Sequence, residues 1–229
     1  MADSLALRLS ARYSPPMTTP LVKICGLNDA AAVDAAVEAG ADYLGFILFP
    51  KSPRNVSAHQ AGQLAARKGA AKSVAVMVDP TEPELAAVLT AMRPDIIQLH
   101  GGESPERCLD ARSYAMEGVW KALGVSTAAD LERAARFSGF VGGFVFDAKP
   151  PKNADRPGGL GAAWDYSLLN AFEARAPWLL AGGLTVETVA EAMAQSGAQG
   201  VDVVSGTESA PGVKDPALIR AFIAAAKGL

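Results

Sequence analysis

The stretch LVKICGLNDAAAVDAAVEAGADYLGFIL (21–48) contains the pattern that decides the fold. It begins with a short apolar run at 21–25, continues through an Ala-rich segment of helical periodicity at 29–40, and ends in a second apolar run at 43–48. Asn28 is the expected N-cap of the helix. Continuous apolar runs of this length are typical of parallel strands that are buried on both faces. The stretch therefore predicts one strand–helix–strand unit with parallel strands.

The same alternation continues along the chain. Helical segments that start with Ser or Thr and end with Gly recur at 57–69 and 185–197. The strand candidates are 21–25, 43–48, 73–78, 95–99, 118–122, 142–147, 177–181 and 200–204. Eight such units predict an α/β fold, a single closed (β/α)8 TIM barrel. A doubly wound open sheet is the alternative, but it would be expected to carry a glycine-rich loop after its first strand, and CGLND (25–29) is not one.

Length and composition are those of one domain. The chain has 229 residues, of which 50% are hydrophobic and 20% are charged, and this is ample for a large buried core. We expect residues 21–229 to form the barrel. Residues 1–20 are expected to be a loose N-terminal tail, since Pro15, Pro16 and Pro20 make a poor helix. This segment also lacks the charged start and unbroken apolar run of a signal peptide.

Charge and hydropathy exclude several classes of partner. The net charge is only −3, and no basic run suggests nucleic acid or an anionic lipid surface. No apolar stretch reaches the ~18–20 residues that a membrane-spanning helix needs. We therefore expect a cytoplasmic protein, in which thiols stay reduced and a disulfide between Cys25 and Cys108 is not expected. The sequence does not fix the oligomeric state; a monomer is expected rather than a homodimer.

Strand parity predicts which side chains point into the barrel. Lys23 and Cys25 share one face of the first strand, and Val22 and Ile24 share the other. The apolar pair should face the helices, so that Lys23 and Cys25 point inward. The same parity directs inward the side chains of Gln98, His100, Val145, Asp147 and Asp202.

The strand ends thus bring a thiol, a carboxylate and an imidazole to one mouth of the barrel, which suits general acid–base chemistry. Each residue also has a structural interpretation. A buried cysteine such as Cys25 is more often a small hydrophobic residue than a catalyst. Asp147 could simply begin a loop, and His100 could be an ordinary hydrogen-bonding residue. Cys108 lies in a helical stretch away from any strand end and is expected to be structural.

Two small turns follow the seventh and eighth strands, where barrel enzymes often bind phosphate through backbone N–H groups. Glycine lets the backbone approach the anion closely. The residues expected to bind phosphate are Gly182, Gly183, Ser205, Gly206 and Thr207. A cationic loop, PKSPR (50–54), lies at the same mouth, and its arginine can form two parallel hydrogen bonds to a carboxylate. A solvated surface loop is the alternative.

Several motifs together resemble the phosphoribosylanthranilate isomerase family, the (β/α)8 enzymes of tryptophan biosynthesis. The resemblance runs from Leu21 to Leu229. It is carried by KICGL (23–27), GADYLGFILFPKSPR (40–54), QLHG (98–101), FDAKP (146–150), AGGL (181–184), VDVVSG (201–206) and PGVKD (211–215). The resemblance implies an Amadori rearrangement of N-(5-phosphoribosyl)anthranilate to 1-(o-carboxyphenylamino)-1-deoxyribulose 5-phosphate. It implies a small phosphorylated substrate and no metal or organic cofactor.

The resemblance also implies roles for residues. Cys25 would be the general base, Asp147 the general acid, and Arg54 the residue that holds the anthranilate carboxylate. The expected substrate-binding residues are Arg54, His100, Gly182, Gly183, Asp202, Ser205, Gly206 and Thr207. The reaction needs a protonated carboxyl and a thiolate, whereas the ordinary pKa values are near ~4 and ~8.5. Lys23 could lower the thiol pKa, or Asp202 could neutralise Lys23, and the sequence leaves this open.

Two positions depart from the family pattern. Val204 stands where a serine is common near the phosphate turn, and Leu160 replaces a hydroxyl residue in the sixth loop. Other functions remain as alternatives. A Schiff-base lyase would use Lys149 or Lys23, and a non-catalytic binding barrel would be free to lose Cys25 or Asp147. Indole-glycerol-phosphate synthase and the tryptophan synthase α subunit share the fold, but they do not explain KICG or PKSPR.

Overall fold

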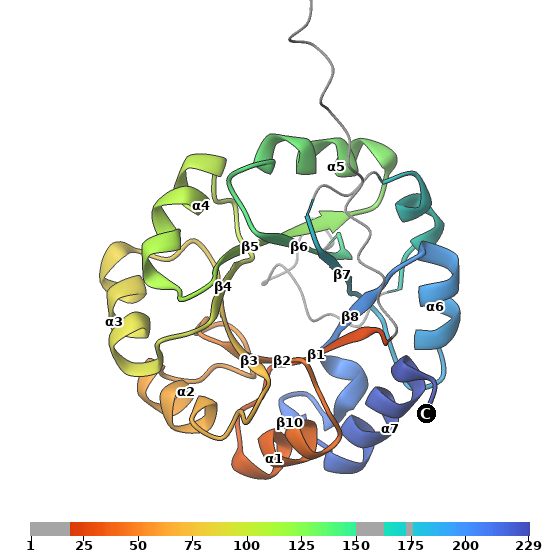
Figure 1. The fold of residues 1–229 in the computed structure, drawn as a ribbon, viewed down its shortest axis with the longest axis horizontal. Coiled ribbons are helices and arrows are strands. Elements are labelled where there is room, and N and C mark those ends of the chain that lie inside the picture. Colours follow the sequence, from red (N-terminus) through yellow and green to blue (C-terminus); the bar gives the residue numbers. More distant parts are fainter. Residues whose placement is uncertain (1–18, 150–162, 173–175) are drawn as a thin grey trace, which may run out of the picture.

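The computed structural model describes residues 19–149, 163–172 and 176–229. Eight parallel strands form a closed barrel in chain order, and helices surround it (Figure 1). The strands are β1 (Leu21–Cys25), β2 (Tyr43–Ile47), β3 (Lys72–Met77), β4 (Ile96–Leu99), β5 (Gly118–Val125), β6 (Gly143–Ala148), β7 (Trp178–Leu180) and β8 (Gly200–Val203). The predicted closed barrel is therefore confirmed, and the open sheet is excluded. The predicted tail falls almost wholly outside the described residues, as does Leu160.

Helices and short 3-10 turns connect the strands. The α-helices are α1 (Ala30–Glu38), α2 (Ala58–Ala65), α3 (Glu82–Met92), α4 (Pro105–Ala111), α5 (Ala128–Glu132), α6 (Val189–Ser196) and α7 (Pro216–Lys227). The 3-10 turns are η1 (Arg112–Tyr114), η2 (Arg133–Phe137), η3 (Tyr166–Ala171) and η4 (Ser205–Thr207). None of the described helices has both the length and the apolar character that crossing a membrane requires.

Two helix starts differ from the predictions. The N-cap of α1 is Asp29 and not Asn28, because the Asp29 carboxylate accepts a hydrogen bond of 2.9 Å from the backbone N–H of Ala32. The Asn28 amide donates instead to the carbonyl of Gly212, far along the chain. The helix predicted from Thr185 begins later, since the preceding residues form a turn closed by the Thr188 hydroxyl.

A short hairpin after β8 was not predicted. It consists of β9 (Glu208–Ala210) and β10 (Val213–Lys214), which pair antiparallel before α7 begins. Its tip contacts the loop after β2 closely. A Cβ atom placed on Gly212 would lie 2.7 Å from the carbonyl oxygen of Pro53, and Gly212 has φ +82, a left-handed conformation that favours glycine.

The core has two layers, as strand parity predicted. Val22 and Ile24 pack between the strands and the helices. Cys25 belongs to a separate cluster inside the barrel, together with Val145 and other residues of alternating parity. This alternation places the inward residues at the C-terminal strand ends around a common axis.

Candidate active site

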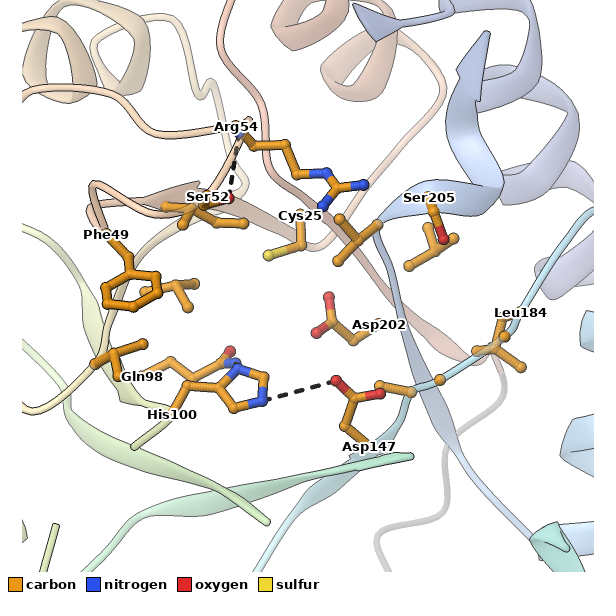
Figure 2. Close-up of a pocket in the computed structure, with 18 residues that line it drawn as sticks. Cys25, Phe49, Ser52, Arg54, Gln98, His100, Asp147, Leu184, Asp202 and Ser205 are labelled. Carbon is orange, nitrogen blue, oxygen red and sulfur yellow. Dashed lines mark hydrogen bonds and ion pairs between the residues drawn. The ribbon is translucent and has the colours of Figure 1, made fainter. Parts of the chain in front are cut away.

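A cavity opens at the C-terminal ends of the strands, and Figure 2 shows the side chains that line it. They come from β1, β2, β3, β4, β6 and β8 and from the loops that follow β2, β3, β4, β7 and β8. The predicted site residues among them are Cys25, Arg54, His100, Asp147, Gly182, Gly183, Asp202 and Ser205. The other two, Gly206 and Thr207, do not line it. Thr207 is fully buried, and its hydroxyl donates to the carbonyl of Val204.

Cys25 ends β1 and lies in the wall of this cavity, with its thiol directed inward (Figure 2). The neighbouring strand makes room for the sulfur. A Cβ atom on Gly45 of β2 would lie only 2.7 Å from Sγ, so glycine is required there. Both cysteines are free, and Cys108 packs in the outer core from α4, as predicted.

A buried ion pair lies next to Cys25 and decides the question that the sequence left open. Lys23 donates to Asp202 over 2.9 Å, and the two side chains are 0% and 4% exposed. Burial is the largest influence on Cys25 and raises its pKa; the Lys23 cation opposes this and the Asp202 carboxylate adds to it. Asp202 thus offsets part of the effect of Lys23, burial outweighs the remainder, and the net pKa of the thiol is raised.

Asp147 and His100 face each other across the lower part of the cavity in Figure 2. Their closest atoms, His100 Nε2 and Asp147 Oδ2, are 3.7 Å apart. Oδ1 of the same carboxyl accepts a hydrogen bond of 2.7 Å from the backbone N–H of Ala148. Burial lowers the pKa of His100 to about 3, helped by the cations Lys121 and Lys23, so the imidazole is neutral at physiological pH.

Arg54 lies at the mouth of the cavity on the loop after β2 (Figure 2). Its guanidinium forms two parallel hydrogen bonds to the carboxylate of Glu208 in β9, from Nε over 2.7 Å and from Nη2 over 2.8 Å. The side-chain stem rests on Gly26, where a Cβ atom would lie 3.1 Å from Arg54 Cδ. The arginine is therefore a fixed, buried cation and not a mobile surface side chain.

The two predicted phosphate turns lie against each other. A Cβ atom on Gly206 would lie 2.0 Å from the carbonyl oxygen of Leu184, a contact that excludes any other residue at that position. Gly182 and Gly183 both have left-handed φ angles. A Cβ atom on Gly182 would lie 2.7 Å from the backbone nitrogen of Ala148. These glycines allow the end of β6 and the turns after β7 and β8 to come close together.

The sequence-based selection missed three residues. Gln98 lines the cavity from β4, and its buried Oε1 has no hydrogen-bond partner among the described residues. Strand parity had directed it inward, and this was the available signal. Glu208 and Lys214, in the unpredicted hairpin, bind Arg54 and the turn after β8. Within the described residues, no group of His, Cys, Asp and Glu side chains could hold a metal ion.

The lysines considered for a Schiff base are placed unfavourably for that chemistry. Lys149 is half-exposed, is paired with Asp130 over 2.8 Å, and does not line the cavity. Lys23 is paired with Asp202 below Cys25. Neither amine is presented to a substrate carbonyl in the cavity.

The chain is similar over most of its length to proteins of one family. Residues 22–225 match the family model of N-(5'phosphoribosyl)anthranilate (PRA) isomerase. The chain is 49% identical over 207 residues to the N-(5'-phosphoribosyl)anthranilate isomerase of Sinorhizobium fredii, covering 90% of this chain and 92% of the relative. It is 50% identical over 208 residues to that of Paramagnetospirillum magneticum, covering 90% and 97%.

Solved structures give the same result. The phosphoribosyl anthranilate isomerase of Thermotoga maritima superposes with a TM-score of 0.82 at 35% identity, covering 92% of this chain and all of that one. A phosphoribosyl anthranilate isomerase in complex with reduced 1-(o-carboxyphenylamino)-1-deoxyribulose 5-phosphate superposes with a TM-score of 0.79 at 32% identity, covering 92% and 100%. With its closed barrel and the match over 22–225, this chain belongs to the N-(5'-phosphoribosyl)anthranilate isomerase family.

Proposed function

We infer that this chain is an isomerase of tryptophan biosynthesis. It converts N-(5'-phosphoribosyl)anthranilate to 1-(o-carboxyphenylamino)-1-deoxyribulose 5-phosphate, as the names of its relatives indicate. The observation that carries this inference is the presence of the Cys25 thiol and the Asp147 carboxyl in one cavity of a barrel of this family. The two groups supply a base and an acid, which are what an aldose-to-ketose rearrangement needs.

The first step is ring opening, with Asp147 as the general acid. Its carboxyl proton passes to the furanose ring oxygen as the bond from that oxygen to C1 breaks. The nitrogen lone pair of the anthranilate group forms the C1=N bond of an iminium ion. His100 is neutral beside Asp147, so it adds no positive charge that would hold the carboxyl in its ionised form.

The second step is proton abstraction, with Cys25 as the general base. The thiolate removes the proton from C2, and the electron pair of that C–H bond forms the C1=C2 bond of an enolamine as the iminium is neutralised. Tautomerisation of the enolamine gives the ketone. The raised pKa of Cys25 makes its thiolate a strong base, although only a minor fraction of the thiol is ionised at neutral pH.

Substrate binding is assigned to the two ends of the cavity. Arg54, fixed by Glu208, would bind the anthranilate carboxylate through a charge-assisted hydrogen bond. The turns at Gly183 and Ser205 would bind the phosphate through backbone N–H groups. We further propose that residues 21–229 form the catalytic domain, that the enzyme acts as a cytoplasmic monomer, and that the reaction needs no metal or organic cofactor.

The direct test is a fluorescence assay that follows loss of phosphoribosylanthranilate with the purified protein. Enzyme-dependent loss, with formation of the ketose product, is the expected result. A control reaction with Cys25→Ala protein separates catalysis from spontaneous decay of the substrate. No enzyme-dependent loss would overturn the proposal, and trapping of substrate by borohydride on a lysine would indicate a Schiff-base enzyme instead.

A further inference from the structure

Lys214 is a buried cation that the mechanism above does not use. It ends β10, and its side chain is 0% exposed. Its ammonium donates to the carbonyl of Val204 over 2.6 Å and to the hydroxyl of Thr207 over 3.1 Å. Oε1 of Glu208 lies 3.3 Å away. Burial of an ammonium group is costly, so these three acceptors are what keep the charge in place.

The first two acceptors belong to the turn after β8. The Val204 carbonyl accepts from the Thr207 hydroxyl as well as from Lys214, and Val204 itself has an irregular backbone with φ −118 and ψ −82. Lys214 thus stabilises the conformation of residues 204–207. This turn carries Ser205, which lines the cavity at the end assigned to phosphate.

The third acceptor leads to Arg54, which is assigned to the anthranilate carboxylate. Glu208 is shared between two cations, because its Oε1 is 2.7 Å from Arg54 Nε and 3.3 Å from Lys214 Nζ. The carboxylate side chain is only 3% exposed, so little water weakens either contact. Displacement of Glu208 would therefore displace the Arg54 guanidinium at the mouth of the cavity.

We propose that Lys214 is a positioning residue that fixes the distance between the carboxylate-binding and phosphate-binding ends of the cavity. It holds the turn after β8 directly, and it holds Arg54 through Glu208. The proposal rests on the proposed function, in which these two ends bind the two anionic groups of one substrate. Since the substrate carries both groups, a change in either end should weaken its binding.

The test uses Lys214→Met, which keeps the length of the side chain and removes its charge. Isomerase KM should rise about 10- to 100-fold, as expected for loss of binding that ground and transition states share. The value of kcat should fall by a smaller factor than KM rises, because the Lys214 cation also lowers the pKa of the Cys25 thiol. Two fragments report on the ends separately: inorganic phosphate, and anthranilate followed by its own fluorescence. Both dissociation constants should rise in Lys214→Met.

A second variant covers the case in which Lys214→Met does not fold. Glu208→Gln keeps the shape of the side chain. It should weaken the binding of anthranilate. The dissociation constant for phosphate should stay within about twofold of the wild-type value, because Lys214 still holds the turn. Lys72→Met is the matched control. Lys72 lies at the start of β3, is half-exposed and pairs with Glu117, so its replacement should change neither dissociation constant.

Folded Lys214→Met protein that binds both fragments like wild type would overturn the proposal. The proposal would also be overturned if, in Glu208→Gln protein, the dissociation constant for phosphate rose by as large a factor as the constant for anthranilate. Fragment binding is measured without turnover. Failure of this inference is therefore distinct from failure of the proposed function, which a wild-type protein without isomerase activity would signal.

Discussion

His100 gives the most direct test of the electrostatics of this site. Its pKa is lowered from 6.5 to about 3, mainly by burial and then by the cations Lys121 and Lys23. Asp147, at 3.7 Å, acts in the opposite direction, but burial and two positive charges outweigh one carboxylate. The imidazole should therefore remain neutral in the folded protein at every pH at which the enzyme is stable.

The pKa shift predicts a loss of stability in acid. Between pH 6.5 and pH 3 the unfolded chain binds a proton at this histidine and the folded chain does not, so the free energy of unfolding falls as pH falls. The slope approaches about 1.4 kcal/mol per pH unit, which amounts to about 2 kcal/mol at pH 5. The side chain is 14% exposed in the cavity, and hydration there reduces the expected value to about 1.5–2 kcal/mol.

The measurement is urea unfolding at pH 8 and pH 5 for wild type, His100→Gln and His59→Gln. His59 is the other histidine of the chain and lies exposed in α2, so it is a matched control. Wild type and His59→Gln should lose about 1.5–2 kcal/mol more than His100→Gln between the two pH values. A difference below about 0.5 kcal/mol would refute the reasoning, because it would show that Asp147 holds the imidazolium in the folded state.

Three further predictions follow from the site. Cys25→Ala and Asp147→Asn should each leave a folded protein with kcat lowered about 10²- to 10⁴-fold, and a variant that keeps more than about a tenth of wild-type kcat would lose its assigned role. Arg54→Ala should raise KM far more than it lowers kcat, and an unchanged KM would mean that Arg54 does not bind the substrate. Val204→Ser should lower the melting temperature, because Val204 packs against the interior cluster; tighter phosphate binding at unchanged stability would contradict this.

Most of the barrel could be predicted because its strands are buried on both faces, which gives each one a continuous apolar run. The predicted and observed strand limits differ little; β1, for example, is 21–25 in both. The hairpin of β9 and β10 could not be predicted, because ESAPGVK (208–214) has neither an apolar run nor a regular alternation. Its conformation depends on tertiary contacts, such as the one from Asn28 to the Gly212 carbonyl.

The same distinction applies to the site. Cys25, Asp147 and His100 could be directed into the barrel because side-chain alternation is a local property of a strand. The partner of Arg54 could not be found, because Glu208 lies 154 residues away and on an element that was not predicted. The direction of the Cys25 pKa shift was also beyond the sequence, since it depends on burial and on the position of Asp202.

The Lys23–Asp202 pair has a consequence for synthesis of the chain. Strand β1 is bonded to β2 and to β8, and Asp202 follows Lys23 by 179 residues. Until β8 has been translated, β1 is therefore an open sheet edge that carries an unneutralised lysine. An inward-pointing charge on an open edge opposes pairing with another chain, and many proteins use it against aggregation. The pair that closes the finished barrel thus leaves a barrel fragment without β8 with a charge on its open edge, and such a charge opposes pairing of that edge.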